Sequence, residues 1–205
     1  MTGSTTKKIL LEEVSNVLEY KADEEDQDDD PDDDPFLHAS DLFAIAHHLD
    51  IRIDLWHSFV GPIALDGVAP IIAGSPGGRH HAIVNTSTLA AGGVHWVHLV
   101  WDKRNTRTGS VVQARILDTM GPNKYAKHVE KAVLDMSDTQ TKLQLLPSLF
   151  TDWQIEQPLF MCGHYQIFMT PSVARQLKDG VALAKLQPEK MAESFMSVIS
   201  TILAG

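Results

Sequence analysis

The chain contains one cysteine, Cys162, and this scarcity excludes an internal disulfide. It also lacks any uninterrupted apolar run of about 18 residues, so the sequence predicts no membrane span. Nothing at its start has the apolar core and small-residue cleavage site of a signal peptide. We therefore expect a protein of a reducing, cytoplasmic compartment.

Positive charge is also scarce, with 17 Lys and Arg against 27 Asp and Glu. Ten of these carboxylates lie between Asp23 and Asp34, and the rest of the chain is balanced at 17 acidic and 17 basic residues. No basic stripe remains that would bind nucleic acid, so this class of partner is excluded. Because like charges repel and two prolines interrupt the run, we expect residues 23–35 to be a disordered linker. Binding to a basic partner surface is the alternative role of this acidic segment.

The linker divides the chain into three parts. Residues 1–22 are an N-terminal extension, in which Lys8–Tyr20 has the apolar spacing of a short amphipathic helix. Residues 36–205 form the globular domain. With 43% hydrophobic residues the chain can bury one ordinary core, and we expect a monomer with a single domain.

Periodicity and turn residues predict a mixture of strands and helices in this domain. The predicted strands cover residues 51–56, 81–84, 94–101, 110–117 and 151–156. The predicted helices start at Ser40 and after Gly121-Pro122, and three more cover residues 162–169, 173–186 and 188–203. Glycine and proline predict a loop over 61–78, and polar residues predict a hairpin turn over 102–109. The mixture predicts an α+β fold with a central mixed sheet flanked by helices.

Cys162 is the candidate nucleophile of a thiol enzyme. A thiol attacks as the thiolate, which is favoured by a neighbouring base or by the unpaired N–H groups of a helix N-terminus. The predicted helix over 162–169 puts Cys162 in its first turn. A buried structural cysteine is the alternative, and it is the commoner role of an isolated cysteine.

His95 is the candidate base, because a strand over 94–101 would hold its imidazole rigidly. Alternation puts Trp96 and His98 on the opposite face of that strand, so His95 and His98 are poorly placed to share a metal ion. Asp118 ends the returning strand of the hairpin, where it could orient the His95 ring and stabilise its imidazolium form. A core histidine and a turn aspartate are the alternatives.

An amide donor for an oxyanion precedes the cysteine. Gln157, five residues before Cys162, could donate its amide to a tetrahedral intermediate together with the backbone N–H of Cys162. Gln154 is the alternative donor. The other histidines lack the paired Cys/His spacing of a zinc site, so we expect neither a metal nor another cofactor.

Three motifs carry a resemblance to a known family: His95-Trp96, the turn Leu117-Asp118-Thr119-Met120-Gly121, and Gln157 before Cys162-Gly163. In this order they resemble the clan CE cysteine peptidases, which include Ulp-type proteases, adenain-like viral proteases and bacterial effectors of the YopJ branch. The resemblance implies a papain-like or Ulp-like fold with four catalytic roles: nucleophile Cys162, base His95, orienting acid Asp118 and oxyanion donor Gln157. It also implies that Trp96 and Gly163 take part in substrate binding, in a groove that admits a Gly-Gly tail.

The chain departs from the family pattern near the cysteine. Met161 stands where the family has Asp before Cys-Gly, and bulky Leu159-Phe160 replaces a more polar loop. The spacing from the glutamine is also about one residue short. These departures favour a divergent, effector-like member that could be secreted and act in a host cytosol.

The sequence thus predicts a thiol isopeptidase that removes ubiquitin or a ubiquitin-like modifier through an acyl-enzyme. Two alternatives stay open. One is a YopJ-type acetyltransferase using the same triad, although Arg79, Lys103, Arg104 and Arg107 are a thin supply for its basic inositol-phosphate pocket. The other is a non-enzymatic binding module in which Cys162 belongs to the core.

Overall fold

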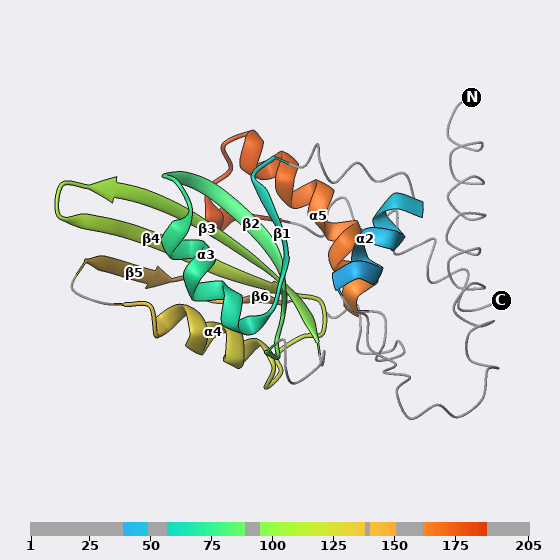
Figure 1. Ribbon diagram of the computed structural model, residues 1–205. Helices are drawn as coiled ribbons and strands as arrows, with labels where there is room; N and C mark the ends of the chain where they lie inside the picture. The colour runs from blue at the N-terminus through green and yellow to red at the C-terminus, as the bar shows by residue number, and fades with distance from the viewer. Residues whose placement is uncertain (1–38, 49–56, 89–94, 138–139, 151–161, 188–205) are drawn as a thin grey trace, which may run out of the picture.

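The computed structural model describes residues 39–48, 57–88, 95–137, 140–150 and 162–187 (Figure 1). The N-terminal extension, the acidic linker, the strands predicted at 51–56 and 151–156 and the helix predicted at 188–203 lie outside these residues. Gln154 and Gln157 lie outside them as well. No helix within the described ranges combines the length and apolarity that a bilayer crossing needs.

Six strands form one mixed sheet. They are β1 (Phe59–Ile63), β2 (Gly78–Asn85), β3 (Trp96–Thr106), β4 (Gly109–Asp118), β5 (Thr141–Leu145) and β6 (Leu149–Phe150). The strand order is β1-β2-β3-β4-β5, and β6 also pairs with β4. β3 runs antiparallel to both of its neighbours, β2 and β4, whereas β1, β5 and β6 pair in parallel with their neighbours. The predicted mixed sheet is confirmed.

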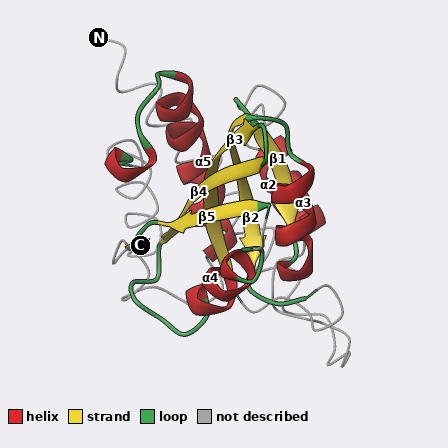
Figure 2. Ribbon diagram, turned by 90° about the vertical axis from the view of Figure 1, so that its left-hand side faces the viewer, coloured by secondary structure: helices red, strands yellow, loops and turns green. Residues whose placement is uncertain are grey.

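Helices cover both faces of this sheet. The helices are α2 (Ala39–His48), α3 (Val68–Gly74), α4 (Ala126–Leu134) and α5 (Cys162–Lys178), with short 3-10 turns η2 (Leu65–Gly67) and η5 (Leu183–Lys185). α3 and α4 share the main apolar core with one face of β2, β3 and β4, while α5 packs on the other face with α2 beside it (Figure 1). In the turned view the strands lie between α3 and α5 (Figure 2). The predicted α+β class is therefore confirmed.

The β3–β4 hairpin is longer than the sequence predicted. The turn expected over 102–109 is wrong, because β3 continues to Thr106, which pairs with Gly109. The polar residues near this end of β3 are exposed on a strand, so their polarity marks solvent contact rather than a turn. Gly109 has φ +152°, and a Cβ there would lie 1.9 Å from the carbonyl oxygen of Gln140, so only glycine fits.

The loop expected over 61–78 is also wrong in part. Residues 59–63 form the edge strand β1, and Val68–Gly74 form α3. Pro70 lies in the first turn of α3, where its missing N–H has no helical partner to lose. Val68 and Ile72 bury the inner face of this helix in the core.

The helices predicted on either side of Pro171 are a single helix, α5, which contains this proline and ends at Lys178, eight residues before the predicted end. A proline inside a helix costs about 3 kcal/mol. The apolar side chains of Met169, Val173 and Leu177 pack against β3 and β4, and this burial holds the helix together across the proline. The sequence prediction stopped the helix because it weighed the proline without this packing.

Candidate active site

The three predicted catalytic side chains come from the ends of three elements. Cys162 begins α5, Asp118 ends β4, and His95 lies immediately before β3. The pairing of β3 with β4 carries the segment around His95 to the end of β4. The backbone carbonyl of His95 accepts a hydrogen bond of 2.8 Å from the N–H of Thr86, which anchors this residue beside β2.

The predicted position of His95 within the strand is wrong. β3 starts at Trp96, so His95 lies outside the strand. The alternation that predicted opposite faces for His95 and Trp96 therefore does not apply to this pair. Trp96 packs in one apolar cluster with Cys162. His95 also interacts with Cys162, so His95 and Trp96 both lie beside the cysteine.

The His95 ring lies between an acid and a thiol. Its Nε2 atom is 2.9 Å from Oδ1 of Asp118, and Cys162 is the other side chain near enough to raise the pKa of the ring. All three side chains are buried, with exposed fractions of 2% for His95, 1% for Asp118 and 4% for Cys162. The structure thus assembles three of the four predicted catalytic residues.

Electrostatics favour a protonated His95. Burial lowers the pKa of His95, but hydrogen bonds and charge from Asp118 and Cys162 outweigh burial and raise it to about 9. At neutral pH the imidazolium form is therefore the stable one. An imidazolium held between a carboxylate and a sulfur can stabilise a thiolate and give a proton to a leaving group.

Asp118 is fixed by a residue that the sequence analysis missed. Oδ2 of Asp118 accepts a hydrogen bond of 2.7 Å from the Asn123 amide, and Oδ1 accepts one from the backbone N–H of Met120. Oδ1 of Asn123 in turn accepts the backbone N–H groups of Tyr125 and Ala126 at the start of α4. The signal in the sequence was an Asn just after Gly121-Pro122, which is the usual place of a helix cap.

One aromatic side chain lies near the His95 ring and another lies beside Cys162. The Tyr125 ring lies 5.9 Å from the His95 ring, centroid to centroid. Trp96 is buried beside Cys162, and Gly163 is buried in the first turn of α5. Trp96 and Gly163 therefore lie next to the candidate nucleophile, and their role in substrate binding stays a prediction.

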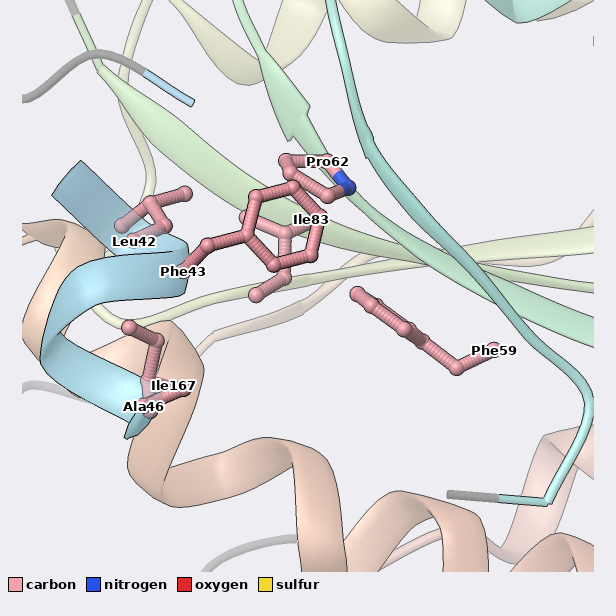
Figure 3. Close-up of a pocket in the computed structure, with 7 residues that line it drawn as sticks. All are labelled: Leu42, Phe43, Ala46, Phe59, Pro62, Ile83 and Ile167. Atoms are coloured by element: carbon pink, nitrogen blue, oxygen red, sulfur yellow. The ribbon is translucent and has the colours of Figure 1, made fainter. Parts of the chain in front are cut away.

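An apolar hollow opens from the cluster that contains Cys162. It is lined by Leu42, Phe43, Ala46, Phe59, Pro62, Ile83 and Ile167. Phe43 projects from α2 over Ile83 towards Pro62 of β1 (Figure 3). The lining has no polar side chain, so the hollow offers no group that would hold a phosphate or a metal ion.

A buried histidine pair lies deeper on the α5 side of the sheet. Nδ1 of His81 is 2.9 Å from Nε2 of His98, and Nε2 of His81 is 2.8 Å from the carbonyl oxygen of His57. Burial lowers the pKa of His81 to about 4 and that of His98 well below its usual value, so both rings are neutral. A carbonyl can only accept, so His81 donates from Nε2 and accepts from His98 at Nδ1.

These ring nitrogens are engaged with each other rather than facing an open site. Across the described ranges, no group of three or more His, Cys, Asp or Glu side chains could hold a metal ion.

No known protein family and no curated protein sequence matches the chain. Solved structures with a similar backbone include a deletion variant of AvrA with IP6 and CoA, at 12% identity and a TM-score of 0.43. They also include the Legionella pneumophila effector RavZ, at 13% identity and a TM-score of 0.39, and RavZ in complex with human LC3B, at 14% and 0.36. The ASFV pS273R protease matches at 14% identity and a TM-score of 0.34 over 88% of this chain and 78% of its own.

The other matches cover part of longer proteins. The AvrA match covers 83% of this chain and 61% of AvrA, and the first RavZ match covers 67% of this chain and 41% of RavZ. At these identities and TM-scores the similarities assign the chain to no family.

Proposed function

We propose that this chain is a cysteine isopeptidase that releases ubiquitin or a ubiquitin-like protein from its conjugates. The observation that carries the proposal is the buried His95 ring, hydrogen-bonded to Asp118 at Nε2 and next to the equally buried Cys162, which helps to raise its pKa. A nucleophile, a base and a group that orients the base are the parts that covalent thiol catalysis needs.

In the first half-reaction the Cys162 sulfur attacks the carbonyl carbon of the C-terminal glycine of the modifier. The C–N isopeptide bond breaks as His95 gives its proton to the leaving lysine nitrogen, and a thioester to Cys162 forms. A water molecule then attacks the thioester carbonyl and gives one proton to His95. The C–S bond breaks, the modifier leaves as its carboxylate with the second proton passing to solvent, and the thiolate–imidazolium pair is restored.

The proposal also assigns the substrate tail and the oxyanion. Trp96 is buried beside Cys162, and a large ring there favours a tail of glycine, whose missing side chain lets the backbone pass closely. The oxyanion would be held by the Gln157 amide and the backbone N–H of Cys162 at the start of α5.

The acetyltransferase alternative requires free cationic side chains for an inositol phosphate. Three of the four cations considered for it are already engaged. Lys103 donates to carbonyls at the end of α3, Arg79 donates to the Val181 carbonyl, and Arg104 lies 3.4 Å from Asp102. This engagement favours the isopeptidase.

The first experiment is incubation with ubiquitin, NEDD8 and SUMO that carry a C-terminal electrophile, with intact mass as the readout. Because Cys162 is the only cysteine, a single adduct reports this residue alone. We expect one adduct on the unaltered chain, with one of the three modifiers, and none on Cys162→Ala. Asp102→Asn, which removes a carboxylate of β3 away from Cys162, serves as the matched control and should react normally.

If the unaltered chain forms no adduct with any of the three modifiers, the isopeptidase proposal is overturned. Turnover of acetyl-CoA that depends on Cys162 would then support the acetyltransferase. Unchanged partner binding by Cys162→Ala, with neither activity, would support the binding module.

A further inference from the structure

One face of α5 carries a polar stripe that docks on β3. Cys162, Gln166 and Thr170 follow one another at intervals of four residues, so they share one side of the helix. Opposite them, Trp96 and His98 share one side of the strand. Gln166 donates to the Trp96 carbonyl over 3.1 Å, and Oγ1 of Thr170 lies 3.5 Å from Nδ1 of His98.

Gln166 joins the three segments that carry the candidate triad. Its Nε2 atom contacts the carbonyl of Trp96, the residue after His95, and Oγ1 of Thr119, the residue after Asp118, at 3.4 Å. Gln166 itself lies one helical turn after Cys162. A single amide group thus links the residues that follow His95 and Asp118 to the helix that begins at Cys162.

A contribution to stability alone does not explain why a glutamine occupies position 166. The Gln166 side chain is fully buried, and its Oε1 atom has no hydrogen-bond partner in the part of the chain that the structure describes. A buried acceptor without a partner is destabilising, and an apolar side chain of the same length would avoid that cost. What an apolar side chain lacks is a pair of donors that hold the helix at one register on the strand.

We propose that Gln166 is a positioning residue that sets the register of α5 on β3 and so holds the Cys162 sulfur at the His95 ring. The inference rests on the proposed function, since it assumes that Cys162 and His95 act as a pair. It assigns Gln166 no contact with substrate. Its effect is to fix the distance between nucleophile and base.

The test compares Gln166→Met with a matched control in the same helix, Gln176→Met. Gln176 donates to Ser172 and to the Gln187 carbonyl and accepts the N–H of Gln187, so its loss removes more hydrogen bonds at the far end of α5. The readouts are the rate of Cys162 alkylation by iodoacetamide at pH 6, the NMR titration of the His95 ring, and the melting temperature.

We expect Gln166→Met to fold, to alkylate roughly tenfold more slowly at pH 6, and to titrate His95 at a lower pH than the unaltered chain. Gln176→Met should lower the melting temperature at least as much and leave both other readouts unchanged. Alkylation and titration of Gln166→Met within twofold and 0.3 pH units of the unaltered chain, as rough limits, would overturn the proposal.

Thr119→Val covers the case in which Gln166→Met does not fold. This substitution keeps the shape of Thr119 and removes only the oxygen that Gln166 contacts, so we expect a smaller slowing in the same direction. No slowing in a folded Thr119→Val variant would then count against the proposal. If the unaltered chain alkylates no faster than a free thiol, the proposed function fails, while the His95 titration still decides whether Gln166 positions the ring.

Discussion

His95 and Asp118 meet across 2.9 Å at one end of the β3–β4 hairpin, from positions 23 residues apart in the chain. The residue before β3 and the last residue of β4 are thereby joined through a ring nitrogen and a carboxylate oxygen. Both groups are buried, and Asp118 helps to raise the pKa of the His95 ring.

Replacing Asp118 by Asn should reduce kcat by roughly 100- to 10,000-fold with little effect on KM. The amide keeps the shape of the carboxylate but removes the charge that supports the imidazolium. The measurement is hydrolysis of a fluorogenic C-terminal amide of the modifier that the electrophile probes identify. Asp102→Asn should keep normal turnover, and a near-normal kcat for Asp118→Asn would remove Asp118 from the mechanism.

The His95 ring should make the protein less stable as the solution becomes alkaline. Its pKa is about 9 when folded and near 6.5 when unfolded, so its stabilisation is complete below pH 6.5 and is lost as the pH rises through 9. The shift corresponds to roughly 3 kcal/mol at most. Urea unfolding at pH 6.5 and pH 9.5 measures it, and His95→Gln should flatten this part of the profile. An equal alkaline loss in both proteins would contradict the assignment.

The buried histidine pair should make the protein less stable in acid. The pKa of His81 is about 4 in the folded chain, so the unfolded chain binds protons first and stability falls as the pH drops from 6.5 towards 4. His98→Gln keeps a donor for His81 and removes one of the two buried bases, so the loss between these pH values should be smaller. Urea unfolding at pH 6.5, 5 and 4 tests this, and an unchanged slope would show that other groups cause the acid response.

Lys103 should contribute to stability by ending α3. Its buried ammonium group donates to the carbonyls of Ile72, Ala73 and Ser75, which α3 leaves without helical partners. Lys103→Met should lower the free energy of unfolding by about 1–3 kcal/mol, because the carbonyls of Ala73 and Ser75 lose a charged donor, while that of Ile72 keeps the Ser75 hydroxyl. Lys142→Met on the exposed side of β5 is the control, and an equal small effect of the two substitutions would refute this role.

The sequence predicted the two strands of the hairpin and helical structure on both sides of Pro171 because these patterns are local. Alternating apolar residues mark the β3–β4 pair. Three of the four proposed catalytic residues of the protein come together where β3, β4 and α5 begin or end. β5 and β6 were missed, because an edge strand of five residues and a strand of two carry too few buried side chains for a pattern. The fourth proposed catalytic residue, Gln157, lies outside the described residues and stays a prediction.

Contacts between distant segments could not be predicted in the same way. Asn123 and Gln166 look like an ordinary turn residue and a misplaced polar residue in a helix until their partners are known. The contact between His81 and His98 could not be predicted for the same reason, since only the register of β2 on β3 brings the two residues together. Pair contacts across strands depend on the fold, which single-residue preferences do not encode.

The length of the hairpin places its turn far from the candidate active site, so the turn can be engineered without changing that site. The turn at Arg107 and Thr108 is exposed and lies about ten residues of strand, roughly 33 Å, from the end that holds His95 and Asp118. A short epitope or fluorescent peptide inserted between these two residues would leave Gly109 against Gln140 and would not alter the strand pairing. The distal turn is thus a point for attaching a reporter, through which substrate capture at the only cysteine could be followed without labelling it.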